Sequence, residues 1–208
     1  MFEHIRSQFA ATFGDDNDLQ VIMAPGRVNL IGEYTDFNEG FVFPMTVDRG
    51  VYVGIRARDD QRVRVKSSRF GELIEYQLDE FEQPDSGHWS CYVLGVVEEL
   101  RLMGLVSGGF DAVIDGNLTL GAGLSSSAAL ETATALALQS LFDFEMSRVD
   151  VATLCQRVEH RYANVMCGIM DQFASGLGRS NHALLLDCRT LSHVNIPTNL
   201  DKYRIVII

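Results

Sequence analysis

The sequence predicts a mixed α and β fold around one hydrophobic core. Some segments alternate apolar and polar residues, as half-buried strands do, whereas others repeat apolar residues every third or fourth position, as helices do. A length of 208 residues corresponds to one large domain or one and a half, and a hydrophobic content of 47% supports a real core. A glycine- and serine-rich stretch, Asn117–Leu130, is the feature around which the other segments are organised.

The first part of the chain is expected to hold a helix followed by strands. Apolar residues recur at helical spacing from Phe2 to Phe13, which predicts a short docking helix. Pro25 and Gly26 are expected to end the first strand and to begin a long loop that reaches Gly40. The predicted strands are Val21–Ala24, Phe41–Val47 and Val51–Arg58, with a turn at residues 48–50 between the last two.

The middle part is expected to add a strand pair, a polar loop and a helix. Val63 and Val65 alternate with charged residues and predict a half-exposed strand, with which Leu73–Leu78 is expected to pair. After the polar loop, apolar residues form a helical stripe from Trp89 to Leu100, which we interpret as core packing.

The glycine- and serine-rich stretch follows a predicted strand, Phe110–Asp115, and opens a helix that is expected to end near Phe142. The first backbone N–H groups of a helix lack internal partners and carry partial positive charge, so this arrangement is suited to binding an anion. Gly121 and Gly123 allow the backbone to approach a ligand closely. The serines that follow add hydroxyl donors and an oxygen that can bind a metal.

Three other interpretations of this stretch are considered. Taken alone, it is explained equally well as a glycine turn with a serine N-cap. No Lys followed by Ser or Thr closes the loop, which excludes a Walker A motif. A dinucleotide-binding fingerprint would have Ser126 in place of its third glycine and Asp143 as the ribose acid. Because Asp143 directly follows the helix rather than a second strand, that interpretation is disfavoured.

The second half of the chain is expected to be mainly helical. Ser147 to Asp150 resembles a capping box, and Glu159 lies at the edge of the apolar face of the helix that it opens. An ionised carboxylate there needs a partner or a cation, unless Glu159 is simply a surface residue. Asp171 falls in the first turn of a short helix, where the helix dipole stabilises a carboxylate. The remaining predictions are that helix, Ile169–Leu177, and buried strands at Ala183–Leu186 and Tyr203–Ile208, the second of which runs off the end and suggests a partial chain.

Composition narrows the classes of function. A formal net charge of −11 and a pI near 4.8 argue against nucleic acid or an anionic membrane as a partner. The cysteines are far apart in the sequence and indicate reduced residues of a cytoplasmic protein. The histidines show no metal-ligand spacing, and no apolar run is long enough to span a membrane. Charged residues near the N-terminus argue against a signal peptide.

Three segments carry a family resemblance. Pro25–Asp36 reads PGRVNLIGEYTD, Gly121–Ala128 reads GAGLSSSA and Gly168–Gln172 reads GIMDQ. In this order they resemble the galactokinases, members of the GHMP small-molecule kinase superfamily, and the resemblance extends from about Gln20 to Asp187. It implies an α+β fold, a two-layer α/β lobe like domain 2 of ribosomal protein S5, with the second lobe of the kinase largely missing.

The resemblance also implies a division of the chain and a set of ligands. Residues 1–187 would form the sugar- and ATP-binding domain, and residues 188–208 would begin the connection to the missing C-terminal domain. ATP and Mg²⁺ are the implied cofactors, and galactose and ATP are the implied partners. The complete protein is expected to be a monomer without a nucleic acid or membrane partner.

The family's functional residues can be carried over position by position. Asp171 is implied to accept the proton of the anomeric hydroxyl of the sugar, with Arg27 beside it as the second catalytic residue. Ser127 and Glu159 are implied to hold Mg²⁺. The implied sugar site consists of Arg27, Glu33, Tyr34, Asp36, Gly168 and Asp171, and the implied ATP site consists of Gly121, Ala122, Gly123, Leu124, Ser125, Ser126, Ser127 and Ala128.

The implied activity is ATP-dependent phosphorylation of galactose to galactose 1-phosphate, with little activity for these 208 residues alone. One alternative is a sensor that binds galactose and ATP without catalysis, which the intact phosphate loop and base disfavour. Another is a kinase of the same superfamily that acts on a different sugar. Tyr34, which stands where the family usually has His, is the one feature that favours this last alternative.

Overall fold

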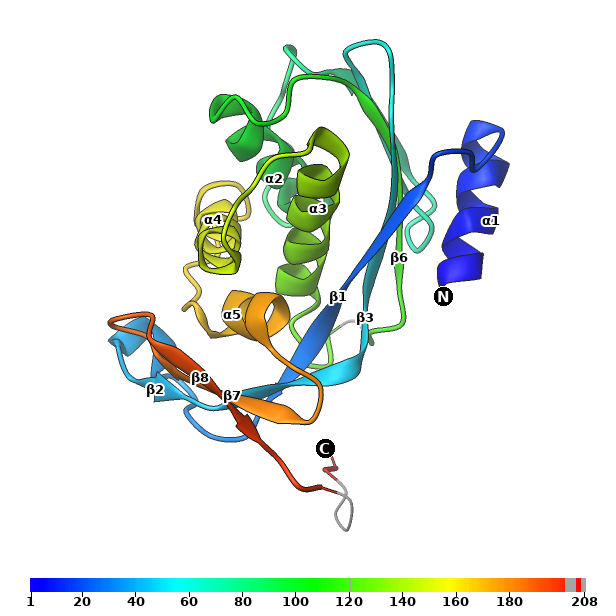
Figure 1. Cartoon of the computed structure of the whole chain (residues 1–208). Coiled ribbons are helices and arrows are strands. Elements are labelled where there is room, and N and C mark those ends of the chain that lie inside the picture. Colours follow the sequence, from blue (N-terminus) through cyan, green and yellow to red (C-terminus); the bar gives the residue numbers. More distant parts are fainter. Residues whose placement is uncertain (120, 201–204, 207–208) are drawn as a thin grey trace.

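The computed structural model describes residues 1–119, 121–200 and 205–206, in which a mixed sheet is packed between helices (Figure 1). Its strands are β1 (Gln20–Asn29), β2 (Phe41–Val42), β3 (Pro44–Ala57), β4 (Arg62–Ser67), β5 (Leu73–Gln77), β6 (Phe110–Gly116), β7 (His182–Asp187) and β8 (His193–Pro197). They lie in the order β2-β7-β3-β6-β4-β5, with β1 also beside β3 and β8 also beside β7. Neighbours are antiparallel except β4 and β6, which are parallel.

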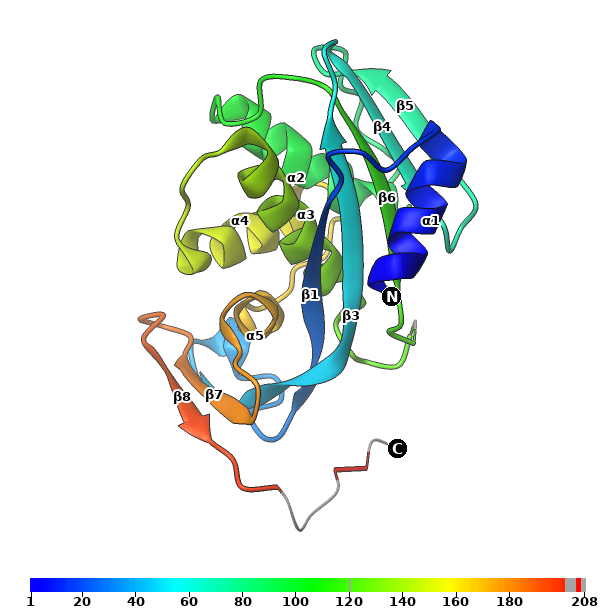
Figure 2. The ribbon, with the colours of Figure 1, turned by 45° about the vertical axis from the view of Figure 1, so that its right-hand side comes forward.

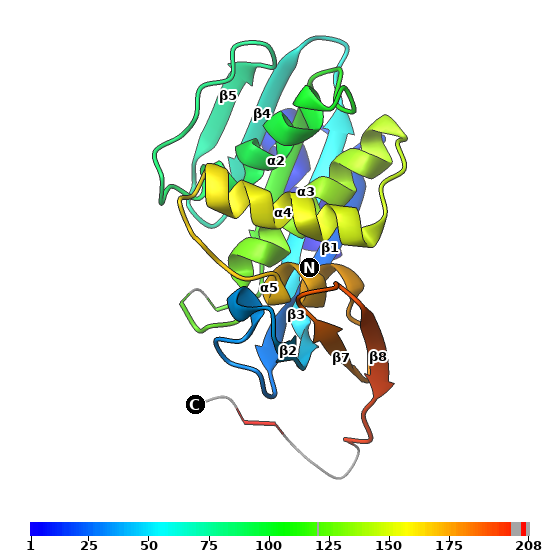
Figure 3. The same ribbon diagram turned by 90° about the vertical axis from the view of Figure 1, so that its left-hand side faces the viewer.

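Helices cover both faces of the sheet unequally. The α-helices are α1 (Phe2–Phe13), α2 (Ser90–Leu102), α3 (Ser126–Phe142), α4 (Arg148–Arg161) and α5 (Met170–Leu177), and a short 3₁₀ helix, η1, spans Asp36–Asn38. Helices α2 to α5 form a layer on one face, whereas α1 lies on the opposite face (Figures 1 and 2). Helix α4 is outermost and crosses α2 and α3 (Figure 3). The strands and helices thus form the α+β arrangement that the sequence predicts.

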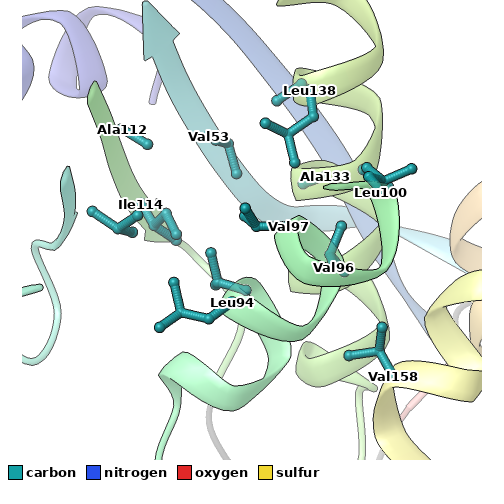
Figure 4. Close-up of a cluster of buried hydrophobic side chains, with 14 of the residues drawn as sticks. Val53, Leu94, Val96, Val97, Leu100, Ala112, Ile114, Ala133, Leu138 and Val158 are labelled. Atoms are coloured by element: carbon teal, nitrogen blue, oxygen red, sulfur yellow. The ribbon is translucent and has the colours of Figure 1, made fainter. Parts of the chain in front are cut away.

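The main core lies between the sheet and this helical layer. Side chains of α2, such as Val97 and Leu100, lie between Val53 of β3 and side chains of α3 and α4 (Figure 4). Helix α3 is rich in alanine and buried along most of its length, which lets the sheet and three helices, α2, α4 and α5, approach it closely. Helix α1 has its own small core through Ile5 and Phe9. The helix predicted from Phe2 to Phe13 is therefore confirmed, as is the core role of the α2 stripe.

The turn predicted at residues 48–50 is wrong, because β3 runs without interruption from Pro44 to Ala57. Gly50 pairs with Pro25 of β1, and a Cβ atom at position 50 would lie 2.3 Å from the carbonyl oxygen of Ala24. The glycine thus permits a close approach between two strands rather than a reversal of the chain.

The predicted end of the first strand at Pro25 is also wrong, because β1 continues to Asn29. The pairing between β1 and β3 shifts register between Pro25 and Arg27, as at a β-bulge. Among the described residues, strand β1 pairs with β3 alone, so the missing N–H of a proline disrupts no second ladder there. This continuation carries Arg27 into the sheet instead of leaving it in a loop.

The end of the chain differs from the prediction. Strand β8 was not predicted, and it extends the sheet past residue 187 by pairing with β7, while the domain division at that residue stays a prediction. Of the strand predicted at Tyr203–Ile208, residues 201–204 and 207–208 lie outside the described residues. Ile205 and Val206 are exposed and belong to no strand, so the structure gives no support to a buried strand there.

Candidate active site

The site is built on the loop between β6 and α3. Gly121 and Gly123 both have positive φ, and a Cβ atom added at either would meet no atom within 4 Å. The loop backbone is therefore open to a ligand at both glycines. Helix α3 begins at Ser126, and Ser125 occupies the N-cap position with φ of 56°.

The Ser125 side chain does not cap α3, which removes the interpretation of this stretch as a simple serine cap. Its hydroxyl instead donates a short hydrogen bond to the Asp171 carboxylate. The first N–H groups of α3 thus receive no hydrogen bond from the N-cap side chain and remain suited to an anion. Asp143 caps the other end of α3 with φ of 52°, so it is a helix-end residue and not the acid of a dinucleotide site.

Strand β1 contacts the loop between β6 and α3 and holds it against the sheet. The backbone N–H of Arg27 donates to the carbonyl of Leu124 at 3.1 Å. A Cβ atom at position 26 would lie 2.6 Å from both that carbonyl oxygen and the Leu118 side chain, so only glycine allows this contact. The motif residues that precede Arg27 thereby fix the distance between the sheet and the loop.

Arg27 and Asp171 form a two-pronged ion pair, although 144 positions separate them in the sequence. Arg27 Nε donates to Asp171 Oδ1 at 2.7 Å, and the Nη2 atom donates to Oδ2 at 2.8 Å. The Nη1 atom of the same guanidinium donates to the carbonyl of Gly123. The side chains of Arg27 and Asp171 are 15% and 27% exposed, so the pair is held rigidly yet remains accessible to a ligand.

The residues predicted to contact the sugar lie in the segment after β1. Asp36 lies in η1 against Gly168, and a Cβ atom at position 168 would be 2.0 Å from its Oδ2 atom. Tyr34 has φ of 60° and is 79% exposed, and its ring packs edge-on against Phe37. The carboxylate of Glu33 accepts from the N–H of Gly32 at 3.2 Å and is exposed. Asp36 is thus brought to Gly168, whereas Glu33 and Tyr34 face outward.

Glu159 is buried on α4, with 4% of its surface exposed, which excludes the surface-carboxylate interpretation. The pKa of its carboxyl group is raised above the ordinary value, chiefly by burial. The nearby Ser127 hydroxyl lowers this pKa in part, whereas the charge of Asp171 raises it further. A buried carboxylate next to a hydroxyl at the start of α3 is a donor set that Mg²⁺ accepts together with phosphate oxygens and waters. Within the described residues, no cluster of three or more His, Cys, Asp or Glu residues could hold a metal.

A cavity of about 500 Å³ adjoins the loop, and the sequence analysis did not identify it as a site. Ser126 and Ser127 line one end, while Phe70, Trp89 and Tyr92 line its walls. Phe70 and Trp89 are stacked with their ring centroids 5.9 Å apart. The helical stripe from Trp89 onward correctly predicts core packing, but its first residues are only partly buried and face this cavity. Only the tertiary arrangement shows that difference.

In the described part of the chain, no helix is long and apolar enough to cross a membrane. The four cysteines, Cys91, Cys155, Cys167 and Cys188, are all free.

Two family models match separate parts of the chain. The model of the GHMP kinases N terminal domain matches residues 91–179, which contain the serine loop, Glu159 and Asp171. The model of the galactokinase galactose-binding signature matches residues 7–57, which contain Arg27 and Asp36.

Curated relatives match almost the whole chain. The galactokinase of Lactococcus lactis subsp. lactis (strain IL1403) is 41% identical over 206 residues, which are 98% of this chain and 52% of the relative. The galactokinase of Bacillus subtilis (strain 168) is 40% identical over 210 residues, which cover 100% of this chain and 54% of the relative. The chain therefore spans about half the length of the curated relatives it matches.

Solved structures agree with these matches. The crystal structure of Lactococcus lactis galactokinase complexed with galactose is similar with a TM-score of 0.91 and 39% identity, over 96% of this chain and 52% of that one. The mevalonate kinase of Methanococcus jannaschii, at 17% identity and a TM-score of 0.73 over 86% of this chain and 56% of that one, shares the fold. The chain thus matches the GHMP kinase N-terminal domain and the galactokinase galactose-binding signature, and it corresponds to the N-terminal portion of the galactokinases to which it is similar.

Proposed function

We propose that the protein containing this chain transfers the γ-phosphoryl group of ATP to the anomeric hydroxyl of galactose. The observation that carries this proposal is the cluster of Arg27, Ser125 and Asp171 beside the free end of α3. In this cluster, a carboxylate that can accept a proton lies next to a loop that can bind phosphate. Phosphoryl transfer depends mainly on such positioning and on charge stabilisation.

In this proposal, the backbone of residues 121–128 binds the phosphates of ATP. Both loop glycines leave room for oxygen atoms, and the helix dipole favours their negative charge. The adjoining cavity accommodates the nucleoside, because its aromatic walls at Phe70, Trp89 and Tyr92 are suited to a planar base.

Asp171 acts as the general base in this proposal. Two donors from Arg27 and one from Ser125 fix the carboxylate in one orientation, so that an oxygen can accept the proton of the attacking hydroxyl. Arg27 also offsets negative charge near the transferring group. Asp36 binds a sugar hydroxyl, and Gly168 keeps that carboxylate close to α5. Glu33 and Tyr34 border the sugar from the outer side.

Ser127 and Glu159 are the residues that would hold Mg²⁺. When bound, the ion would neutralise charge on the phosphate oxygens of the nucleotide. The burial of Glu159 supports this assignment, since a carboxylate removed from water needs a positive partner. The four free cysteines support a cytoplasmic location for the protein.

The proposal is tested by ADP release from ATP by the full-length protein with a panel of sugars. We expect little release by the 208-residue chain alone, because the site is open on its outer side. Release with galactose in preference to glucose, mannose, arabinose and N-acetylgalactosamine is the expected result. The absence of release with every sugar, together with galactose binding by calorimetry, would establish a sensor instead.

A different sugar is the second candidate. Tyr34 has an exposed side chain and a backbone with positive φ, and it lies in the segment that is proposed to bind the sugar. A non-glycine residue in this conformation costs free energy and is retained where the site benefits from it. Preference for another sugar in the same panel would leave the proposed mechanism unchanged and would assign the altered sugar preference to Tyr34. Tyr34→His should then restore preference for galactose.

A further inference from the structure

Helix α5 is attached to β1 at two points, and the roles proposed above use only one of them. The helix lies beside the strand (Figures 1 and 2). Asp171 in its first turn makes the ion pair with Arg27. Ser175 donates its hydroxyl to the backbone carbonyl of Pro25 at 2.8 Å. Residues four positions apart lie on the same face of a helix, so one face of α5 carries both attachments.

Ser175 meets β1 where the pairing of that strand with β3 shifts register, between Pro25 and Arg27. Such an irregularity interrupts the regular ladder of hydrogen bonds and changes the direction of the side chains that follow. Gly50 lies opposite Pro25, but its N–H donates to the side chain of Asn117 at 2.8 Å. The Ser175 hydroxyl therefore supplies a donor to the Pro25 carbonyl at a point where the residue opposite directs its own N–H elsewhere.

The attachment through Ser175 is shielded from water, because this residue is only 6% exposed. The attachment through Asp171 is more open, with 27% of that side chain exposed. A hydrogen bond in apolar surroundings is electrostatically stronger than the same bond in water. The buried bond therefore fixes the position of α5 along β1, while the more open ion pair faces the ligand.

We propose that Ser175 is a positioning residue that sets the place of the Asp171 carboxylate relative to Arg27. Its bond to Pro25 holds α5 against the same short segment of β1 that carries Arg27. Without this bond, α5 can shift along the strand, and the carboxylate no longer keeps one orientation toward the attacking hydroxyl. A displacement of about 1 Å at a reacting group lowers a rate by up to about 100-fold. This inference rests on the proposed function, in which Asp171 is the general base.

The test measures ADP release by the full-length protein with galactose and ATP at varied concentrations. Ser175→Ala removes the hydroxyl without weakening α5 itself, because alanine is a stronger helix former than serine. We expect kcat to fall about 10-fold, whereas KM for ATP stays within about twofold of the wild-type value.

Thr134→Val is the matched control. Thr134 is also buried, and its hydroxyl donates at 2.8 Å to the carbonyl of Leu130 within its own helix, α3. The substitution therefore removes a hydrogen bond of the same kind and length without touching the attachment of α5 to β1. Its kcat should equal that of the wild type.

A double variant separates the positioning of Asp171 from a merely structural role. In Asp171→Asn, the side chain that Ser175 positions no longer accepts a proton, so adding Ser175→Ala should lower kcat no further. A structural role predicts a lower urea unfolding midpoint, with kcat either unchanged or reduced by the same factor in both backgrounds.

Wild-type kcat in folded Ser175→Ala overturns the inference alone, as does an equal loss in the wild-type and Asp171→Asn backgrounds. If Ser175→Ala fails to fold, Ser175→Cys keeps a side chain of similar shape with only a weak donor. A loss of kcat that disappears in the Asp171→Asn background is expected for that variant as well. Turnover near the wild-type level in Asp171→Asn overturns the role of Asp171 as base and the inference with it.

Discussion

At the scale of single residues, Asp171 provides the sharpest test of the proposed chemistry. Asp171→Asn keeps the size of the side chain but removes the proton acceptor. We expect kcat to fall at least about 100-fold in the full-length protein, because general bases contribute about 10² to 10⁴ to a rate. The KM for galactose should change much less. Steady-state ADP release at varied galactose concentration measures both constants.

Asp150→Asn is the matched control for this variant. Asp150 lies in the first turn of α4 and is exposed, so kcat should stay at the wild-type value. Turnover near the wild-type level in Asp171→Asn would remove this residue from the role of base. The Arg27 pair would then be a structural element that joins β1 to α5.

Gly168 tests the sugar-binding segment separately from the chemistry. A Cβ atom at this position would overlap the Asp36 carboxylate, so Gly168→Ala must displace that side chain. Loss of one hydrogen bond to a charged group is worth about 1.5–3 kcal/mol, so we expect KM for galactose to rise about tenfold or more while kcat falls less. The same kinetic assay provides the measurement.

Gly176→Ala, in α5, is the control, because the nearest atom to its added Cβ, the carbonyl oxygen of Arg148 in α4, lies 3.8 Å away. An unchanged KM in Gly168→Ala would show that Asp36 does not contact the sugar.

At the level of residues, the sequence is most informative where a family motif exists. It predicts that Arg27 and Asp171 belong to one site, and the structure places them in one ion pair. It does not predict that the Ser125 hydroxyl donates to Asp171 instead of capping α3. A serine before a helix has the same local sequence whether its side chain caps that helix or bonds to another element. Ser175 carries no local signal either, since its bond to Pro25 depends on where α5 packs against β1.

At the scale of elements, the start of α4 shows how local sequence sets a boundary. The Ser147 hydroxyl accepts from the backbone N–H of Asp150 at 3.1 Å and donates to the carboxylate of the same residue at 2.6 Å. Ser147→Ala removes this cap, and we expect the free energy of unfolding to fall by about 1 kcal/mol. Urea unfolding measures this change, with Ser140→Ala at the exposed end of α3 as the control. Equal stability of the two variants would contradict the capping role.

The strands show why elements are harder to predict than caps. The motif Asp48-Arg49-Gly50 has the composition of a turn, but β3 continues through it because β1 lies against Gly50. Pro25 is typical of a strand end, but β1 continues through its pairing with β3, which in the described part of the chain is its one partner strand. In both cases a partner strand that is distant in the sequence overrides the local preference.

At the scale of the whole molecule, one buried carboxylate links the sheet to α1. Asp111 of β6 is 1% exposed, and it accepts from Arg64 Nε at 2.6 Å and from Arg58 Nη1 at 3.1 Å. Arg64 also lies over the ring of Phe13 in α1, with its guanidinium carbon 4.7 Å from the centroid. Arg64 is thereby held between the back of the sheet and the helix that covers it.

This arrangement predicts how the stability of the protein depends on pH. Burial raises the pKa of Asp111, but hydrogen bonds and charges from Arg64 and Arg58 outweigh it and leave the pKa below its ordinary value. A carboxyl group with a lowered pKa in the folded state binds its proton more readily when the chain is unfolded. Its contribution to stability is therefore full above about pH 4, the ordinary value for Asp, and is lost as the pH falls through the folded-state pKa.

Asp111→Asn should consequently be less stable than the wild type at pH 7, and the difference should shrink as the solution is acidified below about pH 4. Urea unfolding midpoints measured across this range test the prediction. Asp59→Asn, an exposed change near the same arginines, should give a curve parallel to that of the wild type. A constant difference between Asp111→Asn and the wild type at every pH would mean that the carboxylate stabilises the fold through packing. Arg56 and Arg58 would then be paired adequately by Asp15 and Asp60, which also accept from them.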